Sequence, residues 1–460
     1  MISGGEMSRG PALSPAATYW NPILETMPLE RLREVQFRKF RRIVTWAYEN
    51  SRFHRAHYQE TGFEPGDLRT LDDATLVPKV DKGHMRGIQR KDPFPYGDML
   101  CVPLERVTEF RQTSGTTGQA VYQADTWQDW EWWAESWSYL LYAQGYRDTD
   151  RVFLPFGYNI FVAFWAAHYA AEKMGCEVVP GGVLDTEARI LKMQELQTSA
   201  MMATPTYVLG MAETAHSLGI DPARDLAVRR ITCAGEPGAS IPATKRRIEE
   251  AWGAKVYDHC GATEIGAWGF ECEEQSGGIH VNEGLFLAQV EDLETGELIE
   301  EPGRRGKMII TALDRIGMPC VRFDSKDVVE WADEPCSCGR TFRLFKGGVV
   351  GRSDDITKVK GVLLAPSAIE EVVRSFAQLG DEYEVEVTKR GDLDVISLKV
   401  EPAPGVDLSG PTQDEVLRGL KDQLRLKTNL GYKVEVVEAG SLPRYAVKAR
   451  RFKDLRKVNG

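Results

Sequence analysis

The chain has 460 residues, of which 42% are hydrophobic and 27% are charged; this composition is typical of a folded protein and excludes wholesale disorder. Its length favours a large domain together with at least one more. The net charge of −11 excludes nucleic acid or an anionic membrane surface as the main partner, and no apolar run is long enough to span a bilayer.

Residues 1–20 are rich in Gly, Ser, Pro and Ala, and they lack the basic start and apolar run of a secretory signal. We therefore expect a loose tail and a cytoplasmic protein. The eight cysteines are too few for a disulfide scaffold in a chain of this length, so metal binding or burial is expected for them.

Two long helices are expected in the first third of the chain. Apolar residues recur at helical spacing over residues 29–52, with basic residues between them. A second helix is predicted over residues 126–143. Its five tryptophans are Trp127, Trp130, Trp132, Trp133 and Trp137. Aromatic side chains at helical spacing mostly serve burial, so we expect them in the core or at a homodimer interface rather than in a stacking platform.

From residue 151 onward, short apolar runs alternate with helix-like stretches. Strands are predicted at 151–155, 177–180 and 230–234, and helices at 163–174, 186–197 and 241–252. This alternation predicts βαβ units and a mostly parallel sheet. After Gly278 short strands with turn signals predict an antiparallel insert, and after Gly351 a smaller strand–helix pattern begins. We expect an α/β protein with domains over residues 1–351 and 352–460.

The sequence TSGTTG at residues 113–118 follows a strand-like run. Glycines let the backbone approach an anion, and successive N–H groups and hydroxyls cradle a phosphate. The spacing differs from that of the P-loop of NTPases. Taken alone, such a cluster is most often an ordinary loop.

Four further polar segments follow along the chain. They are HCGATE at 259–264, after a predicted strand at 254–257; VRFDSKD at 321–327, expected at a strand end; GRSDD at 351–355 with KVKG at 358–361; and LPRYAVKARR at 442–451. With CAGEP, ECEE, GIH and EPCSCGRT, their joint order resembles the acyl-adenylate-forming ligases, most closely the phenylacetate-CoA ligase group, from about residue 53 to about residue 454.

The resemblance implies a large N-terminal adenylate-forming domain, with mostly parallel sheets and a β insert, and a small mobile C-terminal α+β domain. It implies a carboxylic acid–CoA ligase that forms an acyl-AMP from acid and ATP with release of pyrophosphate, and then transfers the acyl group to CoA. The partners are then a small carboxylic acid, ATP and CoA, with a possible second copy of the chain.

The same resemblance implies a nucleotide site. Its residues are Thr113, Ser114, Gly115, Thr116, Thr117, Gly118, Gly235, Glu236, Pro237, Asp258, Asp327 and Arg352. The first six match the loop that holds the β- and γ-phosphates of ATP, and the next three match the segment along the adenine. Asp258 is expected near the adenine amino group and Asp327 at the ribose hydroxyls, with Arg352 as a second contact.

Three residues are implied to act in catalysis. Glu264 matches the Mg²⁺ ligand and Thr263 matches a phosphate contact; magnesium prefers oxygen ligands and phosphates together. Lys448 matches a lysine that bridges the substrate carboxylate and the α-phosphate, where a cation offsets the developing charge. The alternative for Lys448 is a solvated basic tail.

The C-terminal domain is implied to turn between the two half-reactions. Asp354 matches the hinge, and Lys360 and Gly361 are expected to line the channel for the CoA pantetheine.

The chain departs from the family at several positions. Gln119 stands where the family usually has the lysine that follows TSGTTG, so one phosphate cation is missing. Cys260 replaces an aromatic residue beside the adenine, and Val447 replaces a glycine before the lysine, which stiffens that loop.

Other departures bear on the acid. The acid pocket is expected to be formed by Tyr158, Phe164, His259 and Gly261. Phe164 stands in a stretch where the family has a paired glycine, and His259 replaces an apolar residue. A ring reduces the cavity and an imidazole can hydrogen-bond a hydroxyl, so we expect an acid smaller or more polar than phenylacetate, such as a short hydroxy acid.

Three thiols and one imidazole, Cys272, His280, Cys336 and Cys338, match the donor set of a structural zinc site. The Cys-Ser-Cys spacing is tighter than usual, so a cluster of free or buried cysteines is the alternative. Cys101, Cys176, Cys233 and Cys320 lie in apolar runs and are expected in the core.

Three alternative functions stay open at this point. The acid could be an aryl or arylacetic acid, and the acceptor could be an amine or a carrier protein in place of CoA. The departures at Gln119 and Cys260 also allow a non-catalytic nucleotide-binding protein.

Overall fold

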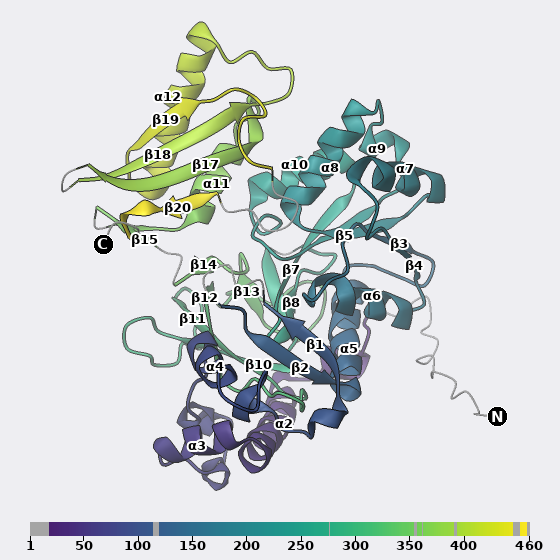
Figure 1. The fold of residues 1–460 in the computed structure, drawn as a ribbon, viewed down its shortest axis with the longest axis vertical. Helices are drawn as coiled ribbons and strands as arrows, with labels where there is room; N and C mark the ends of the chain where they lie inside the picture. Colours follow the sequence, from purple (N-terminus) through teal and green to yellow (C-terminus); the bar gives the residue numbers. More distant parts are fainter. Residues whose placement is uncertain are drawn as a thin grey trace.

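The computed structural model describes residues 18–113, 119–275, 277–353, 357–360, 362–390, 393–444 and 451–457 (Figure 1). A large N-terminal part and a smaller C-terminal part each have their own sheets and their own hydrophobic core. None of the helices in the described ranges is long and apolar enough to cross a membrane.

The main sheet of the N-terminal part has eight strands. They are β3 (Arg151–Leu154), β4 (Glu177–Pro180), β5 (Ala200–Ala203), β6 (Arg230–Cys233), β7 (Lys255–Ala262), β8 (Gly266–Phe270), β9 (Gly278–Val281) and β13 (Leu344–Lys346). Their order is β13-β9-β8-β7-β6-β5-β3-β4. The half from β4 to β7 is parallel and the half from β7 to β13 is antiparallel. The three strands predicted at 151–155, 177–180 and 230–234 are confirmed.

Helices cover both faces of this sheet. They are α5 (Trp127–Ala143), α6 (Ala163–Lys173), α7 (Thr186–Leu196), α8 (Pro205–Ser217), α9 (Pro222–Asp225) and α10 (Pro242–Trp252). Because side chains alternate along a strand, Val152 and Leu154 of β3 pack in one core with α5 and α6. Phe153 packs in a second core with α7, α8 and α10.

Thr126 begins the Trp-rich helix, because its hydroxyl and the Asp129 carboxylate form a reciprocal capping box. Trp130, Trp132, Trp133 and Trp137 are buried within this chain, as expected for the core, whereas Trp127 is 50% exposed.

Two long N-terminal helices pack against an antiparallel sheet, and shorter elements link them to the core. The elements are α1 (Pro22–Glu25), α2 (Leu29–Asn50), α3 (Arg52–Glu60), α4 (Lys82–Gln89), β1 (Val107–Gln112), β2 (Tyr122–Thr126), β10 (Phe286–Glu291), β11 (Arg305–Ala312), β12 (Phe323–Glu330) and β14 (Gly351–Arg352). The sheet order β10-β11-β12-β14 confirms the predicted antiparallel insert. Phe40 and Val44 of α2 pack against Leu287 of β10.

Two motif placements were wrong. The polar segment at 259–264 does not follow a strand that ends at 257, because β7 continues to Ala262 and pairs there with β8. The segment at 321–327 does not end a strand but leads into β12, because Phe323 and Asp324 already pair with β11. In both cases a partner strand extends the ladder past the apolar residues that mark a strand in the sequence.

The C-terminal part is an α+β unit. Its elements are β15 (Thr357–Val359), β16 (Val362–Leu364), α11 (Pro366–Arg374), β17 (Leu379–Arg390), β18 (Leu393–Pro402), α12 (Gly410–Thr428), β19 (Tyr432–Val436) and β20 (Phe452–Asp454). The sheet order is β19-β18-β17-β20. Val385 and Val387 of β17 share one core with Ile369 of α11 and Leu420 of α12. The predicted α/β fold with a separate, small C-terminal unit is therefore confirmed.

Among the described residues, Arg247 makes several of the hydrogen bonds between the two parts. Arg247 of α10 donates to the carbonyls of Arg374 (2.9 Å) and Phe376 (2.6 Å) at the carboxyl end of α11, and to that of Leu379 (3.0 Å) at the start of β17. It also pairs with Asp381 at 2.8 Å. A guanidinium at a helix carboxyl end meets the partial negative charge of the unpaired carbonyls, so Arg247 fixes the orientation of the C-terminal part.

We expect Arg247→Ala to loosen the two parts without unfolding either, because the residue contributes to neither core. Small-angle X-ray scattering should show a larger radius of gyration. Arg246→Ala, at the exposed neighbouring position of the same helix, is the matched control and should leave the curve unchanged. Identical scattering from both variants would contradict this assignment.

Candidate active site

The loops that follow three adjacent parallel strands meet at one edge of the main sheet. Ligands of α/β proteins bind at such carboxyl ends. Thr204 follows β5, Gly235 and Glu236 follow β6, and Asp258 lies in β7 beside them. Gly235 has φ +93°, which favours glycine. The Glu236 carboxylate accepts a hydrogen bond from the Thr206 backbone N–H at 2.9 Å, which ties two of the loops together.

Asp258 is buried at this edge. Burial raises the pKa of its carboxyl to about 8, and the carboxylate of Glu271 adds to the effect. Glu271 accepts from the Asp258 backbone N–H at 3.0 Å and is neutralised by Lys245 at 2.7 Å. A raised pKa favours the neutral form of the Asp258 carboxyl, which can donate a hydrogen bond as well as accept one.

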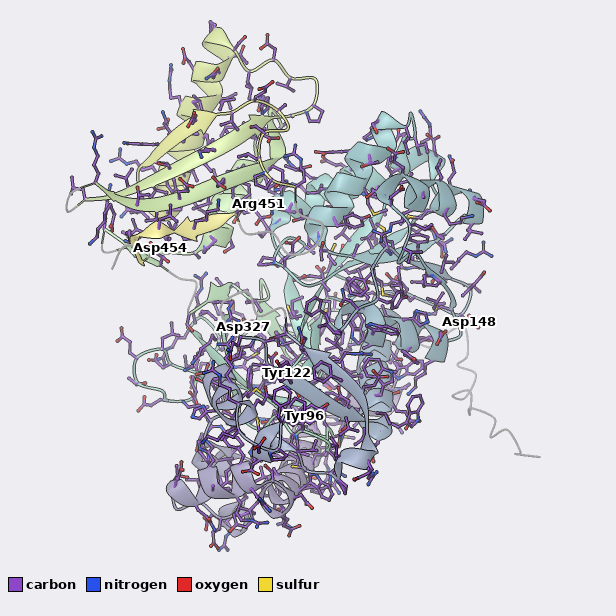
Figure 2. All side chains as sticks on the ribbon, viewed as in Figure 1. Tyr96, Tyr122, Asp148, Asp327, Arg451 and Asp454 are labelled. Carbon is purple, nitrogen blue, oxygen red and sulfur yellow. The ribbon has the colours of Figure 1, made fainter. Side chains whose placement is uncertain are left out.

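Asp327 and Arg352 are brought together by the pairing of β12 with β14, in which they are directly opposite. The Arg352 guanidinium lies 3.2 Å from the Asp327 carboxylate and donates to the Ser325 carbonyl at 3.1 Å. Asp327 lies on the edge of the N-terminal part that faces the C-terminal part (Figure 2). Asp327 and Arg352, both predicted to contact the nucleotide, are therefore neighbours in the sheet of β10, β11, β12 and β14.

Glu264 is 1% exposed, and neither carboxylate oxygen has a hydrogen bond of ordinary geometry to a described residue. The ammonium of Lys82 lies 3.0 Å away. A buried carboxylate without hydrogen bonds fits a cation ligand, and with phosphate oxygens it makes the all-oxygen donor set that Mg²⁺ prefers.

A fully buried ion pair holds the Thr263–Glu264 backbone in place. The guanidinium of Arg315 donates to the carbonyls of Thr263 (3.0 Å) and Glu264 (2.8 Å). It pairs with Asp125 at 2.7 and 2.9 Å, and both side chains are 0% exposed. Sequence reasoning missed Lys82, Asp125 and Arg315, because none of them lies in a motif.

The structure describes only the two ends of the segment that is predicted to hold phosphates, Thr113 and Gln119. Thr113 makes a pair of 3.0 Å hydrogen bonds with the backbone of Val121. Gln119, at the loop exit, accepts from Arg86 at its carbonyl and from Arg90 at its side chain. Several predicted residues lie outside the described ranges, namely Ser114, Gly115, Thr116, Thr117, Gly118, Asp354, Gly361 and Lys448.

The two residues that flank the segment of Lys448 are anchored. Arg444 pairs with Glu401 at 2.7 Å, and Arg451 pairs with Glu382 at 3.0 Å. Arg451 also lies 3.3 Å from the Thr206 hydroxyl, where the C-terminal part meets the N-terminal part (Figure 2). A hollow of about 280 Å³ lies between these parts.

Lys360 lies at the turn between β15 and β16, with φ +50° and its backbone N–H on the Asp394 carboxylate at 3.2 Å. The structure therefore places this predicted CoA contact on the C-terminal part, away from the edge formed by β5, β6 and β7.

Three of the four residues predicted for the acid pocket, Tyr158, Phe164 and His259, belong to a series of aromatic rings in consecutive contact, and the fourth, Gly261, lies beside His259. Tyr158 packs on Phe156 (6.0 Å between ring centroids), Phe156 on Phe164 (5.3 Å) and Phe164 on Trp137 (6.4 Å). Trp137 in turn packs on His259 at 4.3 Å. The helical spacing of Trp137 predicted only burial and gave no sign of its contact with His259.

His259 has a defined tautomer. Its Nδ1 lies 2.8 Å from the Gly269 carbonyl, which can only accept, so Nδ1 carries the proton and Nε2 is an acceptor. Burial lowers the pKa of this imidazole to about 4, so it is neutral at pH 7. A side chain at Gly261 would come within 3.0 Å of Nε2, so glycine keeps that nitrogen open.

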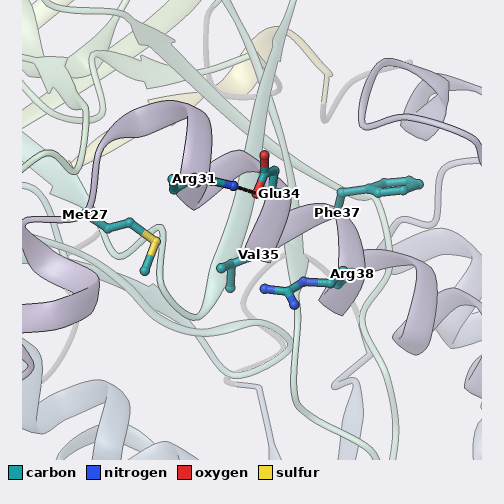
Figure 3. A pocket seen from close by; sticks show the side chains of 6 residues that line it. All are labelled: Met27, Arg31, Glu34, Val35, Phe37 and Arg38. Atoms are coloured by element: carbon teal, nitrogen blue, oxygen red, sulfur yellow. Dashed lines mark hydrogen bonds and ion pairs between the residues drawn. The ribbon is translucent and has the colours of Figure 1, made fainter.

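A second hollow, of about 630 Å³, runs along α2 (Figure 3). It is lined by Met27, Arg31, Glu34, Val35, Phe37 and Arg38. None of the predicted catalytic residues lines it, so it is not the candidate active site.

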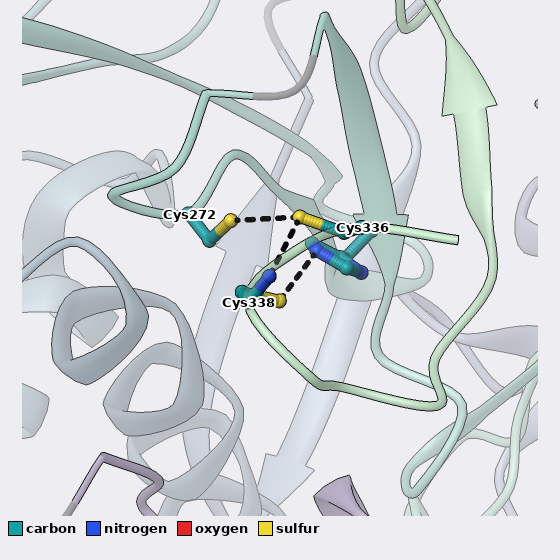
Figure 4. Close-up of side chains that lie close together, drawn as sticks. Cys272, Cys336 and Cys338 are labelled. Carbon is teal, nitrogen blue, oxygen red and sulfur yellow. Dashed lines mark hydrogen bonds between the residues drawn. The ribbon is translucent and has the colours of Figure 1, made fainter. Parts of the chain in front are cut away.

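Cys272, His280, Cys336 and Cys338 form a compact cluster, with ligand atoms all within 4.8 Å of one another (Figure 4). The Cys272 and Cys336 sulfurs are 3.5 Å apart, and Cys338 Sγ lies 3.4 Å from His280 Nε2. Tetrahedral zinc with thiolate and imidazole ligands requires separations of about 3.5–3.8 Å. The Phe342 carbonyl accepts from His280 Nδ1 at 2.9 Å, which orients Nε2 toward the thiols.

The other predicted cysteines behave as expected. Cys101, Cys176, Cys233 and Cys320 are buried and free.

Comparison with known proteins agrees with the fold described above. Residues 361–456 match the family model of the AMP-binding enzyme C-terminal domain. The phenylacetate-coenzyme A ligase of Thermus thermophilus is 32% identical over 456 residues, which cover 95% of this chain and all of that protein.

Two crystal structures of 2-hydroxyisobutyryl-CoA ligase also match, each covering 97% of this chain and 94% of that one. In the postadenylation state with 2-HIB-AMP the TM-score is 0.91 at 29% identity. With 2-HIB-AMP and CoA in the thioesterification state it is 0.72 at 30% identity.

The fold and the edge of β5, β6 and β7 define an adenylate-forming acid–thiol ligase. Within that class the chain belongs to the phenylacetate-CoA ligase family, as its motifs indicated.

We expect Arg315→Ala to lower the free energy of unfolding by about 3–5 kcal/mol, because it leaves Asp125 buried without its partner. Urea denaturation measures the change. Arg305→Ala, which breaks an exposed pair with Glu330, is the control and should change stability by less than about 1 kcal/mol. Equal effects of the two substitutions would contradict a structural role for the buried pair.

Proposed function

We propose that the protein joins a short hydroxy acid to CoA, through an acyl-AMP formed with MgATP. The observation that carries the choice of acid is the neutral imidazole of His259, whose Nε2 can accept a hydrogen bond and whose ring packs on that of Trp137. An acceptor in an apolar wall favours an acid with a hydroxyl donor over phenylacetate, which would leave that nitrogen unpaired.

Two sets of relatives support different parts of the proposed function. The curated relatives at about 30% identity are phenylacetate-CoA ligases, whereas the solved neighbour is a ligase for 2-hydroxyisobutyrate. The first set supports the reaction class. The second shows that a chain of this architecture can act on a short hydroxy acid.

In the first half-reaction the acid carboxylate attacks the α-phosphorus of ATP, and pyrophosphate leaves. We assign Gly235, Glu236 and Pro237 to the adenine, with Asp258 at its amino group, and Asp327 and Arg352 to the ribose. Residues 113–118 would hold the β- and γ-phosphates, with Thr263 as a further contact. Lys448 would offset the charge between the carboxylate and the α-phosphate. Mg²⁺ bound at Glu264 supplies positive charge at the phosphates.

In the second half-reaction the CoA thiolate attacks the acyl carbon, and AMP leaves. We propose that the chain divides into domains at 1–351 and 352–460, and that the small one turns about Asp354 to bring Lys360 and Gly361 to the CoA channel. The separate C-terminal core supports this division. The higher TM-score to the postadenylation state than to the thioesterification state of the solved neighbour supports a movable unit.

We expect faster CoA-thioester formation from 2-hydroxyisobutyrate or a related short hydroxy acid than from phenylacetate, because only the hydroxy acid satisfies His259 Nε2. A CoA-dependent AMP-release assay over both classes of acid measures kcat/KM. His259→Leu should narrow the difference by about tenfold or more through the lost hydrogen bond. Much faster turnover of phenylacetate would contradict the choice of acid, and AMP release without CoA would favour another acceptor.

We also propose that Cys272, His280, Cys336 and Cys338 hold a structural zinc ion. The closed donor set, the separations near tetrahedral values and the oriented imidazole support it. The cluster joins β9 to the loop before β13, so the ion would staple the antiparallel end of the main sheet.

We expect about one equivalent of zinc per chain in the purified protein, measured by plasma mass spectrometry. Cys336→Ser should remove most of it and lower the melting temperature, because binding free energy of a structural metal is folding free energy. Cys176→Ser removes a buried thiol outside the cluster and should retain the zinc. A protein without zinc that is unaffected by Cys336→Ser would refute the site.

A further inference from the structure

We propose that the cluster of three cysteines and one histidine and the N-terminal segment at residues 18–25 form one cooperative unit. Removal of the metal ion releases the segment, and release of the segment weakens metal binding. This inference rests on the zinc site proposed above, because it gives the same ion a second role. The residue that connects the two is Arg340, which follows the last cysteine of the cluster by two positions and bonds to the segment.

The loop that carries the last cysteine provides backbone contacts to the segment. The Tyr19 hydroxyl donates to the Cys338 carbonyl at 2.9 Å. The Thr341 backbone N–H donates to the Glu25 carbonyl at 2.9 Å, and the Thr341 hydroxyl donates to the same oxygen at 3.3 Å. Because Cys338 is itself a predicted zinc ligand, the segment is bonded directly to the backbone of a metal-binding residue.

A buried ion pair adds to these hydrogen bonds. Arg340 Nε donates to the Glu25 carboxylate at 2.5 Å, and the two side chains are 3% and 0% exposed. The guanidinium also lies 3.4 Å from the Thr18 carbonyl and 5.0 Å from the centre of the Tyr19 ring. A buried carboxylate that loses its partner is strongly unfavourable, so Glu25 stays in place only while Arg340 remains beside it.

Arg340 also contacts the cluster. Its backbone N–H lies 3.5 Å from the Cys338 sulfur. Its guanidinium lies 5.9 Å from the centre of the Phe270 ring, and Phe270 stacks on His280 at 5.5 Å. Donors beside a metal ligand orient that ligand, and their loss weakens metal binding. The position of Arg340 therefore depends on the turn that the cysteines form around the ion.

The loop and the segment fit closely at Gly339. A side chain at this position would come within 2.6 Å of the Tyr19 hydroxyl, so a small shift of the loop disturbs the contact. Metal binding and docking of the segment both require the same arrangement of residues 336–341. Two binding events that favour one arrangement strengthen each other by the same factor, which makes the coupling reciprocal.

On its other side the segment lies against α5. Trp20 Nε1 donates to the Glu135 carboxylate at 2.8 Å, and the Trp20 ring packs on that of Tyr142 at 5.9 Å. The segment thus joins the metal cluster to the Trp-rich helix, and its release would separate the two.

Hydrogen–deuterium exchange of the full chain tests the first half of the proposal. The backbone N–H groups of residues 24–26 are hydrogen-bonded at α1, and they should exchange about tenfold or more faster after a chelator has removed zinc. Exchange in α8, which packs on the parallel half of the main sheet, should be unchanged, because the fold there does not depend on the segment.

Competition with a chromophoric chelator tests the reverse half. Arg340→Ala should raise the dissociation constant for zinc by about tenfold or more. Tyr19→Phe removes one hydrogen bond to the loop and leaves the buried ion pair intact, so it should raise that constant by about fivefold. Ile23→Ala, at a position of the same segment that is 76% exposed, is the matched control and should leave it unchanged.

The possible failures are distinguishable. A purified wild-type protein without zinc would overturn the metal site and this inference with it. A zinc-loaded protein in which residues 24–26 exchange equally fast before and after zinc removal would overturn only the link to the segment. Exchange that rises equally in α8 would mean that the ion holds the whole N-terminal part together, and would overturn the link as well. Wild-type zinc affinity in both Arg340→Ala and Tyr19→Phe would also contradict it.

Discussion

A nucleoside triphosphate brings several negative charges into a protein whose own net charge is −11, and the site must meet those charges locally. Two cations of different kinds contact the segment of Glu264, the residue predicted to hold Mg²⁺. Arg315 is fully buried and neutralised by Asp125, so its charge serves to hold the carbonyls of Thr263 and Glu264. Lys82 is partly exposed, and its ammonium lies 3.0 Å from the buried Glu264 carboxylate.

This division explains why a buried carboxylate is stable at 264. An isolated ionised carboxylate in the interior is costly, and it persists only when it is paired or bound to a metal. Arg315 holds the backbone that carries Glu264, and the Lys82 ammonium lies beside its carboxylate.

The second constraint is the contact between the two parts of the chain. It is polar and rests largely on Arg247 at the end of α11 and Arg451 at Thr206. Asp381 is shared by Arg374 and Arg247; although burial raises its pKa, these two guanidinium groups lower it overall. Ion pairs and hydrogen bonds to backbone carbonyls can be broken without exposing a hydrophobic core. Such a contact suits a unit that changes orientation.

Most of the architecture could be predicted from the sequence. The parallel strands and their helices follow from apolar periodicity, and the capping box at Thr126 places the start of α5. The limits of β7 and β12 could not be predicted, because partner strands rather than their own apolar residues extend them. Local pattern carries no information about such pairing.

The residues of the candidate site also fall into two groups, those that the sequence predicts and those that only the fold brings together. Motif residues such as Glu264 and Asp327 could be found from their segments, whereas Lys82 and Arg315 lie in α4 and in the turn after β11, without a motif. Only the fold brings them to Glu264. Likewise the tautomer of His259 depends on the Gly269 carbonyl across the β7–β8 ladder, which is not visible in sequence.

The central claim is that this chain activates a carboxylic acid as an acyl-AMP, with Lys448 as the cation for that step. The most direct measurement compares the two half-reactions in Lys448→Ala and the wild type. Acid-dependent ATP–pyrophosphate exchange should fall by about 100-fold or more. Thioester formation from CoA and supplied acyl-AMP should stay within a few fold. An exchange rate equal to that of the wild type would contradict the account.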